Sequence, residues 1–366
     1  MKKVVYFIRT LSHRRSFETL VERDGIEQMI LGPKSHVLNG VPQGYGDFGI
    51  KNVQIFDTLE DAQKILDTFK PDVLVQAEFD EQAKVPSTCK RVFVGHGMIG
   101  NHMTKLLKKG MNKTKPTFDY CCAQTKMFES FFNHITERKN NVLFNAMPQF
   151  DLLYNKDYYT EYRDIVLNNS KIQNPSRIIL FCGFCCKNRP DYNLHNEDYF
   201  NTVIELAKIS KRNNWLSIIK PRQHHDKAIN FMKKSKKMTK YIKPFTDAIN
   251  SSNLHCIEHI SNTYRYFFAD VIMCNACSTV ETEACVVNKP LILIRTKSGP
   301  DYDPFDTVSS GAASLVKNIN DLEKTINVVL ADTSYVDKQN KLLKSKGIVM
   351  DGMAHKRVQD LICKIA

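Results

Sequence analysis

The stretch ADVIMCNACSTVETEACVVNKPLILIRT, residues 269–296, decides the fold class of this chain. Its residues 271–274 have the apolar character of a buried strand, residues 275–279 form a turn of small polar side chains, and residues 291–294 form a second buried strand. The segment between the turn and the second strand predicts a helix. This is one β-α-β unit, the building block of a parallel sheet covered by helices.

The turn of this unit has the chemistry of an anion site. We expect the hydroxyls of Ser278 and Thr279, with backbone N–H groups at a helix N-terminus, to face a group such as a diphosphate. Glu283, one helical turn further along, is placed to reach sugar hydroxyls. The alternative is that Ser278 only caps the helix and that Glu283 is a solvated helix residue.

Strands alternate with helices along both halves of the 366 residues, which predicts an α/β protein. A chain of this length exceeds what one core usually organises. We predict a Rossmann-like N-terminal domain over 1–147, an interdomain linker over 148–175, a Rossmann-like C-terminal domain over 176–340, and closing helices over 341–366. Two doubly wound domains facing a central cleft would place a site where the carboxyl ends of both sheets meet.

The expected elements outside the opening stretch follow from the same periodicities. In the first half we expect strands at 4–8, 28–31, 53–56, 73–76, 92–94, 120–123 and 141–144, and helices at 16–23, 59–69 and 126–134; in the second half, strands at 177–182, 215–219 and 254–257 and a helix at 197–211.

The composition indicates a globular protein of the cytosol. Apolar residues make up 42% and charged residues 25%, and no run of 18 apolar residues predicts a membrane span. Residues 1–3 lead directly into a strand, without the order of a signal peptide. The 11 cysteines lie mostly among apolar strand segments, which favours reduced thiols. The CxxC pairs at 182–185 and 274–277 match zinc spacing only weakly, so we predict no metal.

The net charge of +13 predicts an anionic partner. Two lysine runs lack the interleaved aromatic residues of a single-strand binding groove, so nucleic acid is not expected. An anionic membrane surface, a polyanionic acceptor and a merely solvated basic face all stay open. The runs are Lys105, Lys108, Lys109, Lys113 and Lys115, and Lys227, Lys233, Lys234, Lys236, Lys237, Lys240 and Lys243.

Three further loops at predicted strand ends carry reactive residue types. His96, between two glycines, is expected on an exposed turn where it can take a proton near neutral pH. Lys220 and Arg222 follow one strand, and Arg189 follows another, as cations suited to phosphate oxygens. The structural alternatives are a loop-stabilising histidine and ordinary basic surface loops.

The order of these motifs resembles that of the CDP-glycerol glycerophosphotransferases, the teichoic-acid polymerase-like enzymes with the GT-B fold. The sequence departs from them at Gly95, where they have tryptophan, and it lacks the histidine of their loop and the acidic residue of their turn, so the donor stays open. The resemblance is carried by His96-Gly97 with Lys105, Pro148 to Leu153, Ile178 to Arg189, Lys220-Pro221, Ala276 to Thr279, and Lys289-Pro290.

The chain also resembles the hydrolysing UDP-N-acetylglucosamine 2-epimerases, which share the GT-B fold. The similar segments are residues 71–76, 278–284 and 351–354. Glu78 stands where that family has aspartate, and Gly97 replaces the glutamate that follows its strand histidine. Because epimerisation needs a carboxylate to move the proton at the sugar carbon, these changes favour a transferase. An epimerase-like enzyme and a non-catalytic nucleotide-sugar-binding protein are the alternatives.

The first resemblance implies a metal-independent transferase without a cofactor. It would move a glycosyl or glycerophosphoryl group from a nucleotide-diphosphate donor to a hydroxyl acceptor, a polyanionic glycan for example, in surface polysaccharide, teichoic-acid-like or glycan synthesis. The implied site has a general base, His96, a set that binds the donor phosphates, Lys220, Arg222, Ser278, Thr279 and Arg189, and a residue that holds the nucleotide ribose, Glu283.

Overall fold

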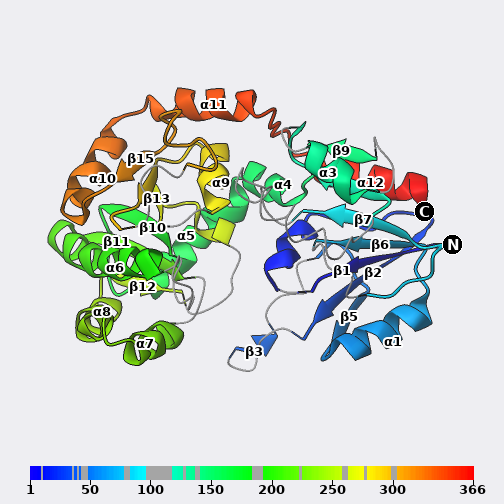
Figure 1. Ribbon diagram of the computed structural model, residues 1–366, viewed down its shortest axis with the longest axis horizontal. Helices are drawn as coiled ribbons and strands as arrows, with labels where there is room; N and C mark the ends of the chain where they lie inside the picture. The colour runs from blue at the N-terminus through cyan, green and yellow to red at the C-terminus, as the bar shows by residue number, and fades with distance from the viewer. Residues whose placement is uncertain are drawn as a thin grey trace. The chain divides into compact units, whose positions relative to one another are not determined.

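The computed structural model describes residues 1–9, 11–34, 37–38, 41–42, 48–77, 83–95, 118–126, 129–136, 141–183, 193–221, 225–257, 263–275, 278–297 and 303–366. The chain divides into two units (Figure 1). The first unit contains Met1–Asn155 and Lys344–Ala366, and the second contains Lys156–Leu343.

Seven parallel strands form the sheet of the first unit, in the order β5-β2-β1-β6-β7-β8-β9. Counted along the chain, this order is 3-2-1-4-5-6-7, a doubly wound arrangement. A separate short hairpin consists of β3 (Val37–Leu38) and β4 (Val41–Pro42). The strands of the sheet are β1 (Lys2–Phe7), β2 (Ile26–Pro33), β5 (Val53–Phe56), β6 (Val73–Gln76), β7 (Lys90–Val94), β8 (Tyr120–Ala123) and β9 (Val142–Phe144).

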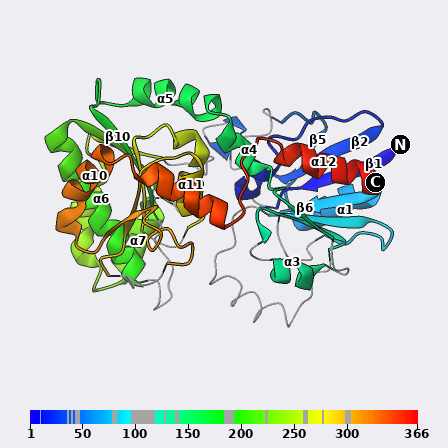
Figure 2. The same cartoon turned by 90° about the horizontal axis from the view of Figure 1, so that it is seen from above.

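Helices cover both faces of this sheet. Ala62 and Leu66 of α1 pack into one apolar cluster with strand residues, and Val358 and Ile362 of α12 pack into another. Because successive strand residues point to opposite faces, the two clusters lie on opposite sides of the sheet. Figure 2 shows α12 lying across the strands. The helices of this unit are η1 (Leu11–Ser16), α1 (Leu59–Phe69), α3 (Glu129–Ile135), α4 (Gln149–Tyr154) and α12 (Ala354–Ile365).

The second unit has six parallel strands in the order β12-β11-β10-β13-β14-β15, which is 3-2-1-4-5-6 along the chain. Its strands are β10 (Arg177–Gly183), β11 (Trp215–Pro221), β12 (Leu254–Cys256), β13 (Val271–Cys274), β14 (Leu291–Ile294) and β15 (Ser314–Val316). Its helices are α5 (Asp157–Asn169), α6 (Asn193–Asn213), α7 (His225–Lys234), η4 (Thr239–Tyr241), α8 (Ile242–Ile249), η5 (Thr263–Tyr266), α9 (Val280–Val286), η6 (Ile319–Asp321), α10 (Leu322–Ala331) and α11 (Tyr335–Ser345).

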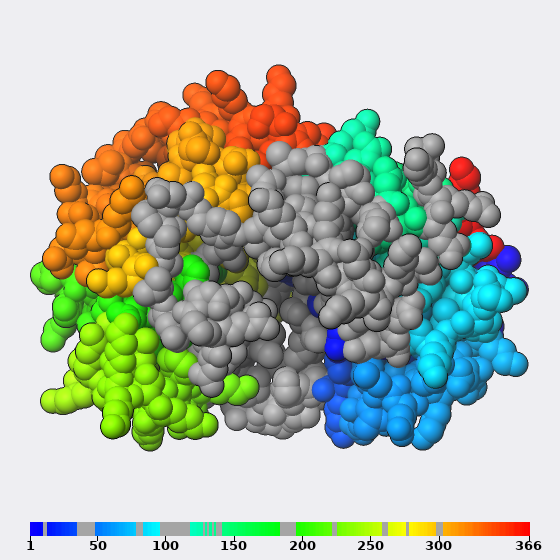
Figure 3. Space-filling model, in the orientation of Figure 1, coloured from blue at the N-terminus to red at the C-terminus, as the bar shows by residue number. Residues whose placement is uncertain are grey.

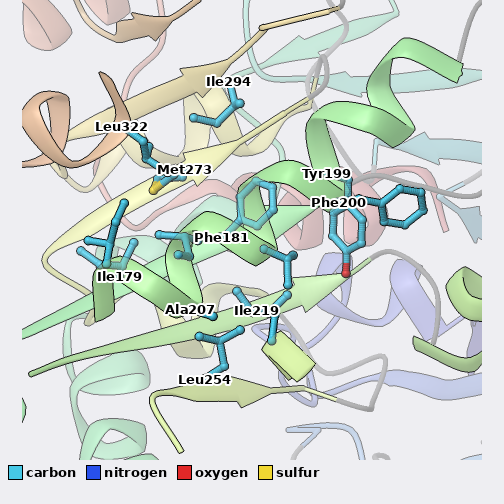
Figure 4. Packing of buried hydrophobic residues seen from close by; sticks show 14 of the residues in the cluster. Ile179, Phe181, Tyr199, Phe200, Ala207, Ile219, Leu254, Met273, Ile294 and Leu322 are labelled. Atoms are coloured by element: carbon cyan, nitrogen blue, oxygen red, sulfur yellow. The ribbon is translucent and has the colours of Figure 1, made fainter. Parts of the chain in front are cut away.

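Aromatic rings pack α6 against one face of the second sheet (Figure 4). The ring of Tyr199 stacks on Phe181 of β10 with centroids 5.8 Å apart, and Phe245 of α8 lies 5.8 Å from the same Tyr199 ring. A Cβ atom at Gly183 would lie 2.2 Å from the Tyr199 ring, so this strand end requires glycine. The Tyr199 ring therefore leaves no room for a side chain at this position.

The end of the chain is fastened to the first unit by a buried carboxylate. Asp151 of α4 accepts hydrogen bonds from the backbone N–H of Ala354 at 3.1 Å and of His355 at 2.7 Å. The imidazole Nδ1 of His355 lies 2.7 Å from the same carboxylate. Since the first N–H groups of a helix lack partners within the helix, Asp151 acts as the N-terminal cap of α12.

Most expected elements are present, and the differences include the following. No helix occupies 16–23: η1 ends at Ser16, and Val21 forms an isolated bridge with Gly49. The stretch predicted as linker, 148–175, contains α4 and α5. Strand β15 was not expected. None of the helices in the described ranges is long and apolar enough to cross a membrane.

We expect Asp151→Ala to loosen α12 without unfolding the second unit. Loss of a buried cap that accepts from two N–H groups should cost about 1–3 kcal/mol locally. Hydrogen exchange of peptides within 354–365 should become roughly 5- to 100-fold faster as a result. Asp157→Ala, an exposed change in the first turn of α5, is the control. Unchanged exchange in α12 would show that Asp151 does not hold it.

Candidate functional site

The strand order of the second sheet reverses between β10 and β13, and doubly wound sheets bind ligands outside the carboxyl ends of their strands at such a switch point. One row of paired residues near this edge contains Cys182 of β10, Lys220 of β11 and Cys274 of β13. Residues of one row point to the same face. Phe181 and Ile219, one position earlier, pack into the core with α6. The row therefore points to the opposite face.

Two residues predicted from the sequence lie at this edge of the second sheet. Lys220, at the end of β11, is the strand partner of Cys182 in the row itself. Glu283 lies on α9, the helix that follows β13. Burial raises the pKa of the Cys182 thiol to about 12, while the Lys220 ammonium acts to lower it and the Glu283 carboxylate to raise it further.

Glu283 is fully buried rather than solvated, since its exposed fraction is 0%. Its Oε1 accepts a hydrogen bond from the Tyr264 hydroxyl at 2.9 Å. Tyr264 lies on η5, before β13, and is itself 0% exposed. A buried phenol that donates to a carboxylate holds the carboxylate in one orientation. The sequence singled out Glu283, but not Tyr264.

The turn before α9 is closed by its own hydrogen bonds. Ser278 Oγ accepts from the N–H of Val280 at 3.3 Å, and Glu281 Oε1 accepts from the N–H of Ser278 at 3.3 Å. The N–H groups of Glu281 and Glu283 donate to the carbonyls of Ser278 and Thr279. These N–H groups, expected to face an anion, are therefore engaged within the turn. Ser278 and Thr279 are half-buried, and their hydroxyls can still bind a ligand.

Glu281 forms a buried polar cluster that the sequence analysis missed. Its carboxylate lies 3.5 Å from the Arg295 guanidinium and accepts from the Thr307 hydroxyl at 3.0 Å. Both Glu281 and Arg295 are almost completely buried. Burial raises the pKa of Glu281 to about 7, although Arg295 and the hydrogen bonds of Ser278 and Thr307 oppose the shift. The Ser-x-x-Glu spacing of Ser278 and Glu281 could have revealed the bond between these two residues, but not the contacts of Glu281 with Arg295 and Thr307.

The start of α6 is tied to the same edge of the sheet. Asn275, which follows β13, donates from Nδ2 to the His195 carbonyl at 2.8 Å, and its own carbonyl lies 3.1 Å from His195 Nδ1. Burial lowers the pKa of His195, although the Asn275 hydrogen bond opposes this. Asp198 accepts from the Thr296 and Lys297 N–H groups at 3.0 and 2.9 Å. These bonds fix the loops after β13 and β14 against α6.

Several predicted residues lie outside the described part of the chain. They are the expected base His96, the cations Arg222 and Arg189, Lys105, Glu78, the lysine run 105–115, and Cys185 and Cys277 of the CxxC pairs. Within the described ranges, no group of three or more His, Cys, Asp or Glu side chains is placed to hold a metal ion.

Two doubly wound parallel sheets with helices on their faces define an α/β protein of the GT-B fold class, as the sequence predicted. The sequence matches no protein-family model and no curated protein. The likeness to known proteins therefore lies in the fold.

Solved structures of two kinds superpose on the chain over nearly its whole length. One is the wall teichoic acid polymerase TagF, with a TM-score of 0.68 and 14% identity, covering 99% of this chain and 88% of that one. Another is the UDP-GlcNAc 2-epimerase of Neisseria meningitidis, with a TM-score of 0.63 and 15% identity, covering 99% and 100%. The epimerase of Methanocaldococcus jannaschii gives 0.58 and 15%, covering 99% of each chain. These are the two families that the motifs resemble.

We expect Glu281→Gln to change how the stability of the second unit depends on pH. Between its ordinary pKa of 4.5 and its folded value of about 7, Glu281 keeps a proton in the folded protein that the unfolded chain has lost. This group therefore makes the free energy of unfolding fall as pH rises through that window. The glutamine variant lacks this loss, so relative to wild type it should gain roughly 2–3 kcal/mol between pH 4.5 and 8.

Urea unfolding followed by tryptophan fluorescence measures this, because the single tryptophan, Trp215, lies in β11 of the second unit. Glu323→Gln is the matched control. Hydrogen bonds from Asn213 and Arg212 lower the pKa of Glu323. Glu323 therefore changes the free energy of unfolding with pH only at pH values below about 4.5. Parallel pH profiles for wild type and Glu281→Gln would contradict the assignment.

Proposed function

We propose that this chain is a transferase that moves a glycosyl or glycerophosphoryl group from a nucleotide-diphosphate donor to a hydroxyl acceptor. One observation carries the proposal: at the switch point of the second sheet, Lys220 ends β11 in the row beside Cys182, and α9, which follows β13, holds the buried Glu283 carboxylate. A cation and an oriented carboxylate at the carboxyl end of this sheet suit the two polar parts of a nucleotide, its phosphates and its ribose.

The donor phosphates are assigned to Lys220 and to the hydroxyls of Ser278 and Thr279. Arg222 and Arg189 complete the set in this proposal. Positive charge and hydroxyl donors placed where charge develops on the leaving phosphate lower the barrier, and they do so without a bridging metal.

The ribose is assigned to Glu283. Its carboxylate already accepts a hydrogen bond from Tyr264, which holds it in place. An ionised carboxylate has room for several hydrogen bonds, so a ribose hydroxyl can bind the same group while the Tyr264 bond is kept. Binding the ribose in this way requires the donor to reach a side chain that is fully buried in this structure.

His96 is assigned as the general base that takes the proton of the acceptor hydroxyl while its oxygen attacks. With a glycosyl donor, this oxygen bonds to the anomeric carbon, the bond from that carbon to the phosphate oxygen breaks, and a nucleoside diphosphate leaves. With a glycerophosphoryl donor, the oxygen bonds to phosphorus, the anhydride P–O bond breaks, and a nucleoside monophosphate leaves. In both cases the leaving phosphate takes the electron pair.

Both groups of structural neighbours support a nucleotide-activated donor. A TagF variant was soaked with CDPG, and the Neisseria meningitidis epimerase was bound to UDP-GlcNAc. The proposed acceptor is a hydroxyl of a polyanionic glycan, of the surface polysaccharide or teichoic-acid-like kind.

The same fold also fits an epimerase-like enzyme and a nucleotide-sugar-binding protein without catalysis. An epimerase that abstracts a proton at the sugar carbon exchanges that hydrogen with solvent. Incubation of UDP-GlcNAc in deuterium oxide therefore separates epimerisation from transfer. Binding with neither exchange nor transfer selects the non-catalytic protein.

We expect one nucleotide family to stabilise the protein in a thermal-shift panel of CDP, UDP, GDP, CDP-glycerol and UDP-N-acetylglucosamine. Ligand at a hundred times its Kd stabilises the folded state by about 2.7 kcal/mol. Lys220→Gln should weaken binding of that nucleotide roughly 10- to 100-fold, because a hydrogen bond to a charged group is lost. Lys211→Gln, an exposed change on α6, should not. If none of the five ligands raises the melting temperature, the proposed donor site is excluded.

We expect His96→Ala to abolish transfer while the Kd of the nucleotide changes less than about threefold, because a general base acts on the acceptor and not on the donor. Single-turnover assays with the stabilising donor, together with calorimetric titration, measure the two quantities. Wild-type turnover by the variant would exclude His96 from the mechanism. A joint loss of turnover and nucleotide binding would instead assign it to the donor site.

A further inference from the structure

The segment that contains α7, η4 and α8 presents a strongly basic surface, which we call the lysine face. Thirteen residues between positions 226 and 250 are exposed, and seven of them are lysines. The only exposed acids of this segment are Asp226 and Asp247. Figure 3 shows the surface of this segment in yellow-green. The seven lysines are Lys227, Lys233, Lys234, Lys236, Lys237, Lys240 and Lys243.

The packing of the segment puts these lysines on its outer side. Ala228 and Met232 of α7, Tyr241 of η4, and Phe245 and Ala248 of α8 are all buried in the apolar cluster that α6 shares with the sheet. On α7 the exposed positions fall on the arc of the helix opposite the buried ones. The side that faces solvent is therefore the basic one, and the core of the unit holds its shape.

Few of these charges are neutralised within the protein. Lys237 pairs with Glu197 at 2.7 Å. Among the described residues, no carboxylate lies within ion-pair distance of the other six lysines. The helices α10 and α11 of the same unit contrast with this. Their stretch from 317 to 343 exposes four lysines but also three aspartates. Residues 317–343 therefore do not share the excess of positive charge that the lysine face carries.

The lysines are close enough to act together on one extended anionic surface. Lys233 and Lys234 are adjacent in α7, and Lys227 lies six residues before Lys233, roughly 9 Å along the helix, which is about one Debye length at physiological ionic strength. Clusters of four to eight basic residues are typical of proteins that bind anionic lipid. The potential above the lysine face is therefore a property of the whole cluster.

The side-chain types discriminate between kinds of anionic partner. All seven cations are lysines, which are flexible, hydrated point charges, and arginine, which binds phosphate bidentately, is absent from residues 225–250. No large apolar or aromatic side chain of this segment is exposed. Grooves that bind single-stranded nucleic acid combine basic residues with stacking rings, and a folded acidic partner needs fixed complementary groups. A membrane surface, whose anionic lipids move laterally, needs neither stacking rings nor fixed complementary groups.

We propose that the lysine face docks the second unit on a membrane surface that contains anionic lipid headgroups. The contact is electrostatic and does not insert side chains into the hydrocarbon region, so it is reversible and sensitive to salt. It is independent of the transferase reaction.

The test is cosedimentation of the full chain with vesicles of phosphatidylcholine alone or mixed equally with phosphatidylglycerol. We expect binding only to the mixed vesicles at 50 mM salt, with most of it lost at 500 mM. Each lysine near an anionic surface strengthens binding roughly fivefold, so the triple variant K233Q/K234Q/K236Q should bind about a hundredfold more weakly. This variant spares the Lys237–Glu197 pair.

The matched control is K317Q/K324Q/K341Q, which removes three exposed lysines from the mixed surface of the second unit. It has the same net charge as the test variant and should lose less than about threefold. Equal losses of vesicle binding in both variants would show that only the net charge matters and would overturn the proposal. Failure of wild type to bind the mixed vesicles would also overturn it.

A second experiment measures the binding of labelled polyphosphate by fluorescence anisotropy. Binding to polyphosphate without binding to vesicles would assign the lysine face to a soluble polyanion. Trp215 fluorescence verifies that both variants are folded.

Discussion

The register of β10 between β11 and β13 is the constraint on which the candidate site depends. It places Cys182 beside Lys220 on one side and Cys274 on the other. Because successive strand residues alternate between faces, a shift of one residue would turn Cys182 into the core and Phe181 outward. The stacking of Tyr199 on Phe181 opposes such a shift, so the same apolar packing that stabilises the sheet also positions the polar groups at its edge.

Buried polar groups give this edge its rigidity. Glu281, Glu283 and Asp198 are all 0% exposed, and each accepts hydrogen bonds from residues distant in sequence. A buried carboxylate without such donors would be strongly destabilising. Loops after different strands are therefore connected through shared acceptors rather than through apolar contacts. An arrangement of this kind is set before a ligand arrives, which reduces the ordering that binding requires.

The sequence was sufficient to predict the architecture of the two sheets, because parallel strands buried on both faces appear in a sequence as short apolar runs separated by helices. α1 was located correctly at 59–69, since Thr58 and Asp61 form a capping box and Lys70 ends the helix with a positive φ of 55°. Prediction was weaker where a residue's role depends on contacts across the chain. Glu281 and Arg295 are 14 positions apart, Tyr264 and Glu283 are 19 apart, and neither pair has a local signature. Asp151 was assigned to a linker motif, although its partners lie about 200 residues later.

The discontinuity of the first unit has a consequence for synthesis on the ribosome. Val358 and Ile362 cover one face of a sheet whose strands all lie within the first 144 residues. The part of that face that α12 covers stays open to solvent until α12 has emerged, whereas every segment of the second unit has been made by residue 343. The unit that comes first along the chain is thus completed last, and during this interval its apolar surface is open to contacts with other chains.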